Sequence, residues 1–143
     1  MIWVGDLEAD GLLDTATCIW VGVFLSYPDK QEKVFLDIGE MVEWMEGKTI
    51  AFHNGAGYDR ELIKKLYGVD NFQLIDTLKL SQMMYPHRQS HSIEAWGNEI
   101  GIQKPEHEDW SKYSDDMLHR CKEDVKIGWH ILDKAMKKWR KVK

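Results

Sequence analysis

The chain has 143 residues, of which 43% are hydrophobic and 30% are charged, and its formal net charge is −5. This length fits one compact domain with one core, so we expect residues 1–143 to form a single domain. The longest apolar stretch, residues 19–25, is too short to span a bilayer. The acidic residue at position 6 argues against an N-terminal signal peptide. We therefore predict a soluble, cytoplasmic protein.

The charge and the cysteines narrow the class of protein further. Cys18 and Cys121 form no Cys-x-x-Cys pair, so reduced thiols are expected. A net negative charge argues against binding nucleic acid through a broad basic surface. It does not exclude an enzyme that acts on a chain end, which needs only a small contact area. Five Lys and one Arg fall in residues 134–143; we interpret them as a solvated helix end, with a nucleic-acid contact as the alternative.

The hydrophobic pattern predicts an α/β domain with a five-stranded mixed sheet flanked by helices. Strands are predicted at residues 2–4, 17–26, 32–38, 48–53 and 72–75. Helices are predicted at residues 37–47, 59–67, 77–85, 92–100 and about 114–138, with Ser114 as an N-cap and a loop at Lys104 and Pro105. The first three strands read as an antiparallel meander. The helix before the fourth strand suggests a crossover and parallel pairing.

Two acids follow the apolar start of the first strand. Asp6 and Glu8 are two residues apart, so the two-residue repeat of a strand points both carboxylates to one side. Such a pair repels unless a cation lies between its members, and Mg²⁺ is a usual partner. The alternative is the solvated end of a strand, and this stretch alone does not decide between the two.

Two further acids occupy unusual positions. Asp59 follows a glycine-rich turn between a strand and a helix, where functional groups gather in α/β folds. Asp124 lies within the C-terminal helix beside apolar residues, where an acid is uncommon. Each alone is more often a surface acid or a cap. Together with Asp6 and Glu8, however, they supply the carboxylates that a two-metal phosphoryl-transfer site needs.

The order of these motifs carries a resemblance to a known family. Asp6-Leu7-Glu8 matches an Asp-x-Glu motif, Asn54 followed by Tyr58-Asp59 matches a second motif, and Asp124 ends a third. Residues 75–78 and 90–97 add two matching segments. With these features the chain resembles the DnaQ-like 3′-to-5′ exonucleases of the DEDD superfamily, and in particular the proofreading domains of phage family-A DNA polymerases. The resemblance implies a ribonuclease H-like fold.

The third motif implies the His branch of that superfamily. One branch carries a Tyr four residues before the last Asp, where this chain has Arg120. The other carries a His five residues before it, where this chain has His119. Five residues on an ideal helix turn about 140° away from the face of Asp124. His119 can therefore serve only if the helix is broken or begins near it, and the alternative is a surface histidine.

The resemblance also implies a two-metal mechanism with Mg²⁺ or Mn²⁺. Asp6 would bridge two divalent cations, Glu8 and Asp124 would complete the first, and Asp59 would hold the second. Neutral His119 would take a proton as hydroxide attacks the terminal phosphodiester, and nucleoside 5′-monophosphates would be released.

The same resemblance suggests which residues contact substrate. Leu12 or Leu13 would wedge against the terminal base, with Tyr58 beside it and Asn54 from the second motif nearby. His91 resembles a position near the substrate strand. Core packing is an equally good interpretation of Leu12 and Tyr58.

The leading hypothesis is an exonuclease that acts on single-stranded or frayed 3′ ends of DNA. The resemblance to phage domains suggests that it is phage-encoded and acts in the host cytoplasm. A separate DNA polymerase or replication protein is a possible partner, and no membrane is involved. The nearest alternative is a 3′-to-5′ exoribonuclease or oligonucleotide-degrading enzyme. A third is a catalytically weak ribonuclease H-like module that binds a partner.

Overall fold

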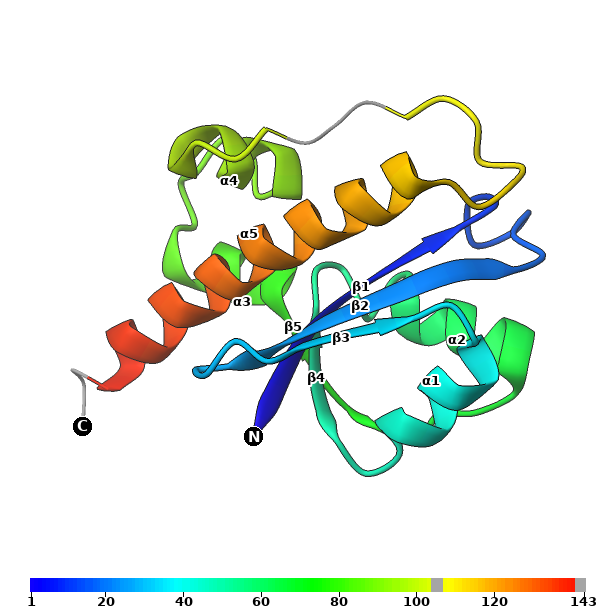
Figure 1. The fold of residues 1–143 in the computed structure, drawn as a ribbon. Helices are drawn as coiled ribbons and strands as arrows, with labels where there is room; N and C mark the ends of the chain where they lie inside the picture. Colours follow the sequence, from blue (N-terminus) through cyan, green and yellow to red (C-terminus); the bar gives the residue numbers. More distant parts are fainter. Residues whose placement is uncertain (104–106, 141–143) are drawn as a thin grey trace.

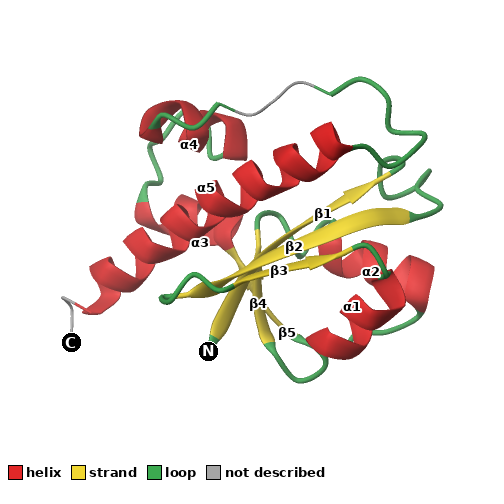
Figure 2. Ribbon diagram, in the orientation of Figure 1, coloured by secondary structure: helices red, strands yellow, loops and turns green. Residues whose placement is uncertain are grey.

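The computed structural model describes residues 1–103 and 107–140, so the predicted loop at 104–105 lies outside the described residues. One five-stranded sheet in the order β3-β2-β1-β4-β5 is flanked by helices (Figures 1 and 2), as predicted. The strands are β1 (Ile2–Ala9), β2 (Ile19–Tyr27), β3 (Glu32–Phe35), β4 (Thr49–Phe52) and β5 (Gln73–Asp76). The helices are α1 (Ile38–Met45), α2 (Asp59–Tyr67), α3 (Thr77–Met84), α4 (Ile93–Ile100) and α5 (Asp115–Arg140).

The middle strand, β1, pairs differently along its two sides. It pairs with β2 in antiparallel fashion from Ile2 to Ala9, whereas its parallel pairing with β4 ends where Val4 lies opposite Ala51. β1 is therefore longer than the predicted residues 2–4, because pairing with β2 satisfies the backbone beyond the apolar run. Beyond Val4, β1 no longer pairs with β4 and pairs with β2 alone. We call this segment, residues 5–9, the free part of β1. This part of β1 carries both Asp6 and Glu8.

The two faces of the sheet are covered by different helices. Trp3 and Leu7 belong to a core cluster that includes buried residues of α1 and α2. Val4 belongs to a second cluster with Cys121 and Val125 of α5. Because side chains alternate along a strand, Asp6 and Glu8 share the face of Val4, beneath α5. Figure 1 shows α5 lying across this face of the sheet.

A close approach of α5 to β1 depends on Gly128. A Cβ at Gly128 would lie 3.1 Å from Cγ1 of Val4. Asp124 is four residues earlier and therefore on the same side of the helix. The approach that Gly128 allows thus brings Asp124 toward the strand that carries Asp6 and Glu8.

Side-chain caps explain where several helices begin. Asp37 accepts a hydrogen bond from the Glu40 N–H, so the chain turns into α1 and the predicted third strand, 32–38, is too long. Ser114 Oγ accepts from the Met117 N–H at 3.2 Å, which confirms the predicted cap of α5. None of the helices in residues 1–103 and 107–140 has the length and apolar character that crossing a membrane requires.

We expect Gly97→Ala in α4 to lower the free energy of unfolding by about 2 kcal/mol. A Cβ at Gly97 would lie 2.5 Å from the carbonyl oxygen of Ile102 and 2.8 Å from Cδ1 of Ile127, and a backbone atom cannot easily move aside. Urea unfolding would measure the change. The control is Gly39→Ala in α1, where the nearest atom is 3.3 Å away and helix propensity favours Ala. Equal stability of the two variants would contradict the packing account.

Candidate active site

Four carboxylates from three elements meet at the free part of β1. Asp6 and Glu8 come from β1, Asp59 is the first residue of α2, and Asp124 lies on the inner face of α5. The charges of the other three all raise the pKa of Asp6, so the four groups are close enough to repel one another. Glu8, Asp59 and Asp124 are buried. The structure thus brings together the four acids that the sequence singled out.

The glycine-rich turn between β4 and α2 places Asp59. Asp76, at the end of β5, accepts hydrogen bonds from the N–H groups of Asn54 at 2.9 Å and Ala56 at 3.2 Å. Asn54 adopts a left-handed conformation with φ of 62°, and its carbonyl accepts from the N–H groups of Gly57 and Tyr58. The turn is therefore fixed by both neighbouring parallel strands. Asp76 thus supports the position of Asp59, and it also caps α3 by accepting a hydrogen bond from the Leu78 N–H at 3.0 Å.

Burial and mutual repulsion shift the pKa values of these acids upward. Burial is the main cause for Asp6, whose pKa lies well above its ordinary value, and the charges of Glu8, Asp124 and Asp59 add to it. Burial also raises the pKa of Asp59 to about 8, with a partly opposing hydrogen bond from its own backbone. Without a bound cation, the cluster is thus most stable when it keeps protons.

The donor atoms of the cluster suit a divalent cation. Asp6 Oδ2 is buried and makes no hydrogen bond in the described part of the structure. One ligand atom from each of Asp6, Glu8 and Cys121 lies within 4.8 Å of the other two. Carboxylate oxygens favour hard cations such as Mg²⁺ or Mn²⁺. A cation would offset the repulsion that raises the pKa of Asp6, so the residues present fit the metal that the resemblance implies.

Cys121 is a member of this cluster that the sequence analysis did not assign to the site. Its thiol donates a hydrogen bond to the Asp6 carbonyl oxygen at 3.3 Å. Burial raises the pKa of the thiol well above its usual range, and the charges of Asp6 and Glu8 raise it further. The thiol therefore stays protonated and helps to hold β1 against α5. Cys121 is three residues before Asp124, and residues at this spacing are neighbours on a helix, so its place beside the site could have been predicted from the sequence.

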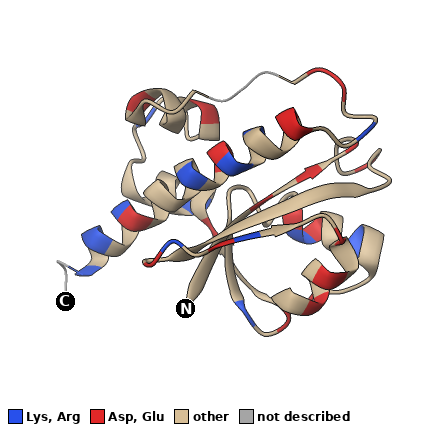
Figure 3. Ribbon diagram, in the orientation of Figure 1, with Lys and Arg blue, Asp and Glu red and all other residues tan. Residues whose placement is uncertain are grey.

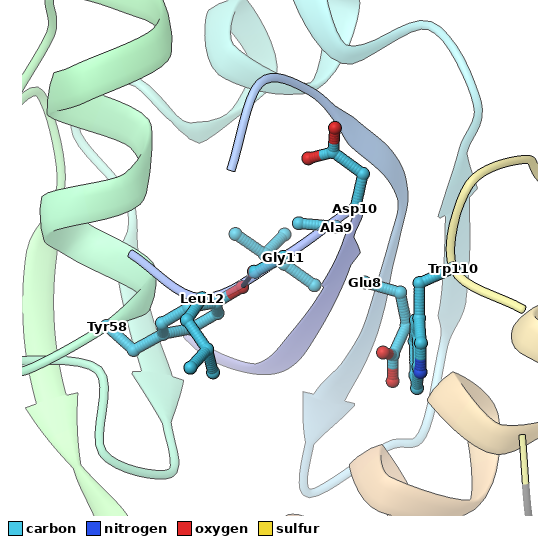
Figure 4. A pocket seen from close by; sticks show the side chains of 8 residues that line it. Glu8, Ala9, Asp10, Gly11, Leu12, Tyr58 and Trp110 are labelled. Atoms are coloured by element: carbon cyan, nitrogen blue, oxygen red, sulfur yellow. Dashed lines mark hydrogen bonds between the residues drawn. The ribbon is translucent and has the colours of Figure 1, made fainter. Parts of the chain in front are cut away.

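A cavity of about 380 Å³ opens beside the acids. Leu12, 74% exposed, and Tyr58 lie together on one side of it, and Glu8 and Trp110 lie on the other (Figure 4). The Tyr58 hydroxyl donates to the Gly11 carbonyl oxygen at 2.9 Å, which ties α2 to the loop after β1. Trp110 was missed by the sequence analysis, because an aromatic residue in an irregular loop gives no periodic signal. The cavity has both an apolar and an acidic side.

Three predicted site residues lie elsewhere in the structure. His119 is exposed on a continuous α5, so the helix is not broken between it and Asp124. Asn54 shapes the turn and is not among the residues that line the cavity. His91 is also absent from that lining; its Nδ1 bonds to Ser81 Oγ at 2.6 Å. Of the predicted substrate contacts, only Leu12 and Tyr58 line the cavity.

Charge is unevenly distributed around this site. Figure 3 shows acidic residues along the end of β1 and in the first turns of α5, and basic residues at intervals along α5 as far as its C-terminal end. The last turn of α5 contains Lys137, Lys138 and Arg140. Basic side chains at the C-terminus of a helix complement its dipole, as the sequence analysis expected.

No family model matches the chain. The chain is 25% identical to the DNA-directed DNA polymerases of Enterobacteria phage T3 and Escherichia phage T7, over 93% of its own length. It spans about a quarter, 26%, of the length of each polymerase.

Solved structures share the fold at lower identity. Brucella melitensis NrnC with bound Mg²⁺ superposes with a TM-score of 0.75 at 17% identity, covering 98% of this chain and 74% of that one. Exonuclease X in complex with 5′ overhanging duplex DNA superposes with a TM-score of 0.58 at 17% identity, covering 94% and 92%. The fold is thus of the predicted ribonuclease H-like class. With its acidic motifs in order, the chain is similar to the DnaQ-like 3′-to-5′ exonucleases.

Proposed function

We propose that the chain is a metal-dependent 3′-to-5′ exonuclease domain of the DEDD type that acts on DNA. The observation that carries this proposal is the convergence of four carboxylates at the free part of β1, beside a cavity with an aromatic wall. Buried acids that raise one another's pKa are costly for a fold, and such costs concentrate at functional sites. The similarity to phage DNA polymerases and to nucleases supports the same reaction class.

The residues of the site have distinct roles in this proposal. Asp6, Glu8, Asp59 and Asp124 hold two divalent cations, Mg²⁺ or Mn²⁺. Bound there, such cations supply Lewis acidity that activates water and stabilises a leaving oxygen. The residues of the cavity orient the 3′ end of the substrate strand.

The cavity provides the subsite for the terminal nucleotide. Leu12 and Tyr58 lie against one side of the 3′-terminal base, and Trp110 lies against the other side. Stacking on aromatic rings accepts any base, so we expect little base preference.

The substrate strand is either DNA or RNA, and we favour DNA. This reaction class does not depend on reading a 2′-hydroxyl, so we expect the site to accept either sugar. The similarity to phage DNA polymerases favours DNA. A specific observation favours the second candidate, an enzyme that degrades short oligonucleotides: NrnC, which shares the fold, was solved bound to pGG. A polymerase or another replication protein is the partner that we propose for a DNA-directed activity.

The general base predicted from the His branch can be tested directly. His119 is exposed on a regular helix and, by helix geometry, points about 140° away from Asp124. We therefore expect His119→Gln to lower kcat by less than about tenfold, below the 10²- to 10⁴-fold effect typical of a positioned base. Single-turnover rates across pH would measure it. A loss above a hundredfold with the loss of one ionisation from the pH profile would restore His119 to the mechanism.

The proposed function is tested by digestion of end-labelled strands. Single-stranded DNA and RNA of one sequence, labelled at the 5′ or the 3′ end, are incubated with Mg²⁺, Mn²⁺ or EDTA. The proposal predicts a metal-dependent ladder from the 5′-labelled DNA, early release of the label from the 3′ end, and nucleoside 5′-monophosphates as products. A faster ladder on RNA would favour the second candidate. No cleavage of any substrate would exclude the nuclease.

A further inference from the structure

Arg120 lies on the active-site side of α5 and has no assigned role. It is four residues before Asp124, so the two side chains project from the same face of the helix. The next residue, Cys121, contacts the Asp6 carbonyl oxygen. Arg120 is half-buried, with its Nε in the interior. Its place in the helix therefore brings a cation to the edge of the carboxylate cluster.

The guanidinium group is also positioned by the cavity wall. Its central carbon lies 5.2 Å from the ring centroid of Trp110, a cation–π distance. Trp110 itself is held, because its carbonyl oxygen accepts a hydrogen bond from Trp20 Nε1 of β2 at 2.9 Å. Trp110 lines the cavity together with Glu8. Arg120 is thus anchored against Trp110, on the side of the cavity that also carries Glu8.

Two other basic residues of α5 form ion pairs with acids outside the carboxylate cluster. Lys122 forms an ion pair with Glu32 of β3 at 3.3 Å, and Lys126 pairs with Glu123 at 3.0 Å. None of the described residues that line the cavity is basic. The cations of the proposed function offset part of the charge of a phosphate in this acidic site, and Arg120 is placed to add a directional contact from the protein.

We propose that Arg120 binds the phosphate of the terminal phosphodiester. The guanidinium group donates hydrogen bonds to its non-bridging oxygens, whose charge grows as the phosphate is attacked. The planar fork of arginine matches a phosphate group, and anchoring by Trp110 reduces the reorganisation needed during the reaction. This role rests on the proposed function. It gives the site a cationic contact that the four acids cannot supply.

The first test compares Arg120→Gln and Arg120→Lys with the control Lys122→Gln, two residues further along the same helix. Loss of one preorganised donor to developing charge predicts a fall in kcat on the order of 10²-fold for Arg120→Gln. Arg120→Lys keeps a point charge without the fork and is expected to lose less. Lys122→Gln is expected to stay within about twofold of the unmodified protein. A kcat for Arg120→Gln equal to that of the control would overturn the proposal.

The second test has a readout that a merely structural role would not change. Binding of a short 5′-fluorescein-labelled oligo(dT) is measured by anisotropy at several NaCl concentrations and constant Mg²⁺, in an Asp59→Asn background that prevents turnover. Each lost phosphate contact on a single strand makes the negative slope of log K against log salt shallower by about 0.7. Arg120→Gln should show the shallower slope and Lys122→Gln should not.

The two tests also separate this proposal from the proposed function. An unchanged salt slope in Arg120→Gln overturns the phosphate contact even if kcat falls. If the unmodified protein cleaves no substrate, the proposed function fails, while the salt slope still decides whether Arg120 contacts phosphate.

Discussion

Asp6→Asn should abolish nuclease activity and at the same time raise the melting temperature of the metal-free protein. Asp6 is the acid whose pKa is raised by burial and by the charges of the three other carboxylates. Its Oδ2 makes no hydrogen bond in the described part of the structure. Asn has the same shape but no charge, so it removes the repulsion together with a metal ligand. Activity and stability are therefore expected to change in opposite directions.

The sizes of the two effects follow from the same interactions. A lost metal ligand removes several kcal/mol of transition-state stabilisation, and each 1.4 kcal/mol is about tenfold in rate, so kcat should fall on the order of 10³-fold or more. Relief of repulsion should raise the melting temperature in EDTA by about 5 °C. Initial rates and calorimetry with EDTA would measure both changes.

Glu123→Gln is the matched control for Asp6→Asn. Glu123 is next to Asp124 in the chain, but its carboxylate pairs with Lys126 at 3.0 Å. Neutralising it should cost at most about 0.5 kcal/mol of stability and leave the rate unchanged. An Asp6→Asn variant that cleaves DNA within tenfold of the normal rate, or that melts earlier than the unmodified protein, would contradict this account of the cluster.

The metal-free protein should lose stability as the pH rises from 5 to 8, and Mg²⁺ should restore it. Burial raises the pKa of Asp59 from its ordinary value of 3.8 to about 8. A carboxyl group whose pKa is higher in the folded state stabilises the fold while it is protonated. That contribution is complete below the unfolded pKa and is lost as the pH rises through the folded pKa. Bound Mg²⁺ replaces the protons and removes the penalty.

The expected change is large enough for thermal melting. Each pKa unit corresponds to about 1.4 kcal/mol, so Asp59 alone accounts for up to about 4 kcal/mol between pH 5 and 8, or roughly 10 °C in melting temperature. His130 acts in the opposite direction below pH 6.5, because burial lowers its pKa, but it is one partly exposed group. In Asp59→Asn the decrease in EDTA should be smaller, and the part that remains is due to Asp6, whose pKa is also raised by burial. Melting temperatures that are independent of pH in EDTA would contradict the raised pKa values of the buried carboxyl groups.

The fold was predictable to the extent that local patterns determine it. Helices were predicted to begin at residues 37, 77 and 92, and α1, α3 and α4 begin within one residue of these positions. Asp37, Asp76 and Ser92 cap these helices through local side-chain hydrogen bonds. The length of β1 was underestimated. Its polar half is a strand because β2 pairs with it, and that partner is not visible in residues 5–9 themselves.

The site was predictable only for residues that belong to ordered motifs. The four acids stand at the free part of a strand, at the start of a helix and on a helical face, and the structure brings them together. Trp110 reaches the cavity from an irregular loop, and Cys121 resembles a core residue, so neither had a distinctive pattern. Arg120 was noticed only as a mismatch to a motif. Its significance comes from contacts made in three dimensions.

The most direct test of the central claim is to locate bound metal at the carboxylates. Crystals grown with Mn²⁺ and a nucleoside 5′-monophosphate are measured on both sides of the manganese absorption edge. We predict anomalous peaks in contact with Asp6, one of them shared with Glu8 and Asp124 and another near Asp59, with the nucleotide in the adjoining cavity. Well-ordered crystals in which Mn²⁺ occupies other sites and leaves these four carboxylates without a peak would contradict the account.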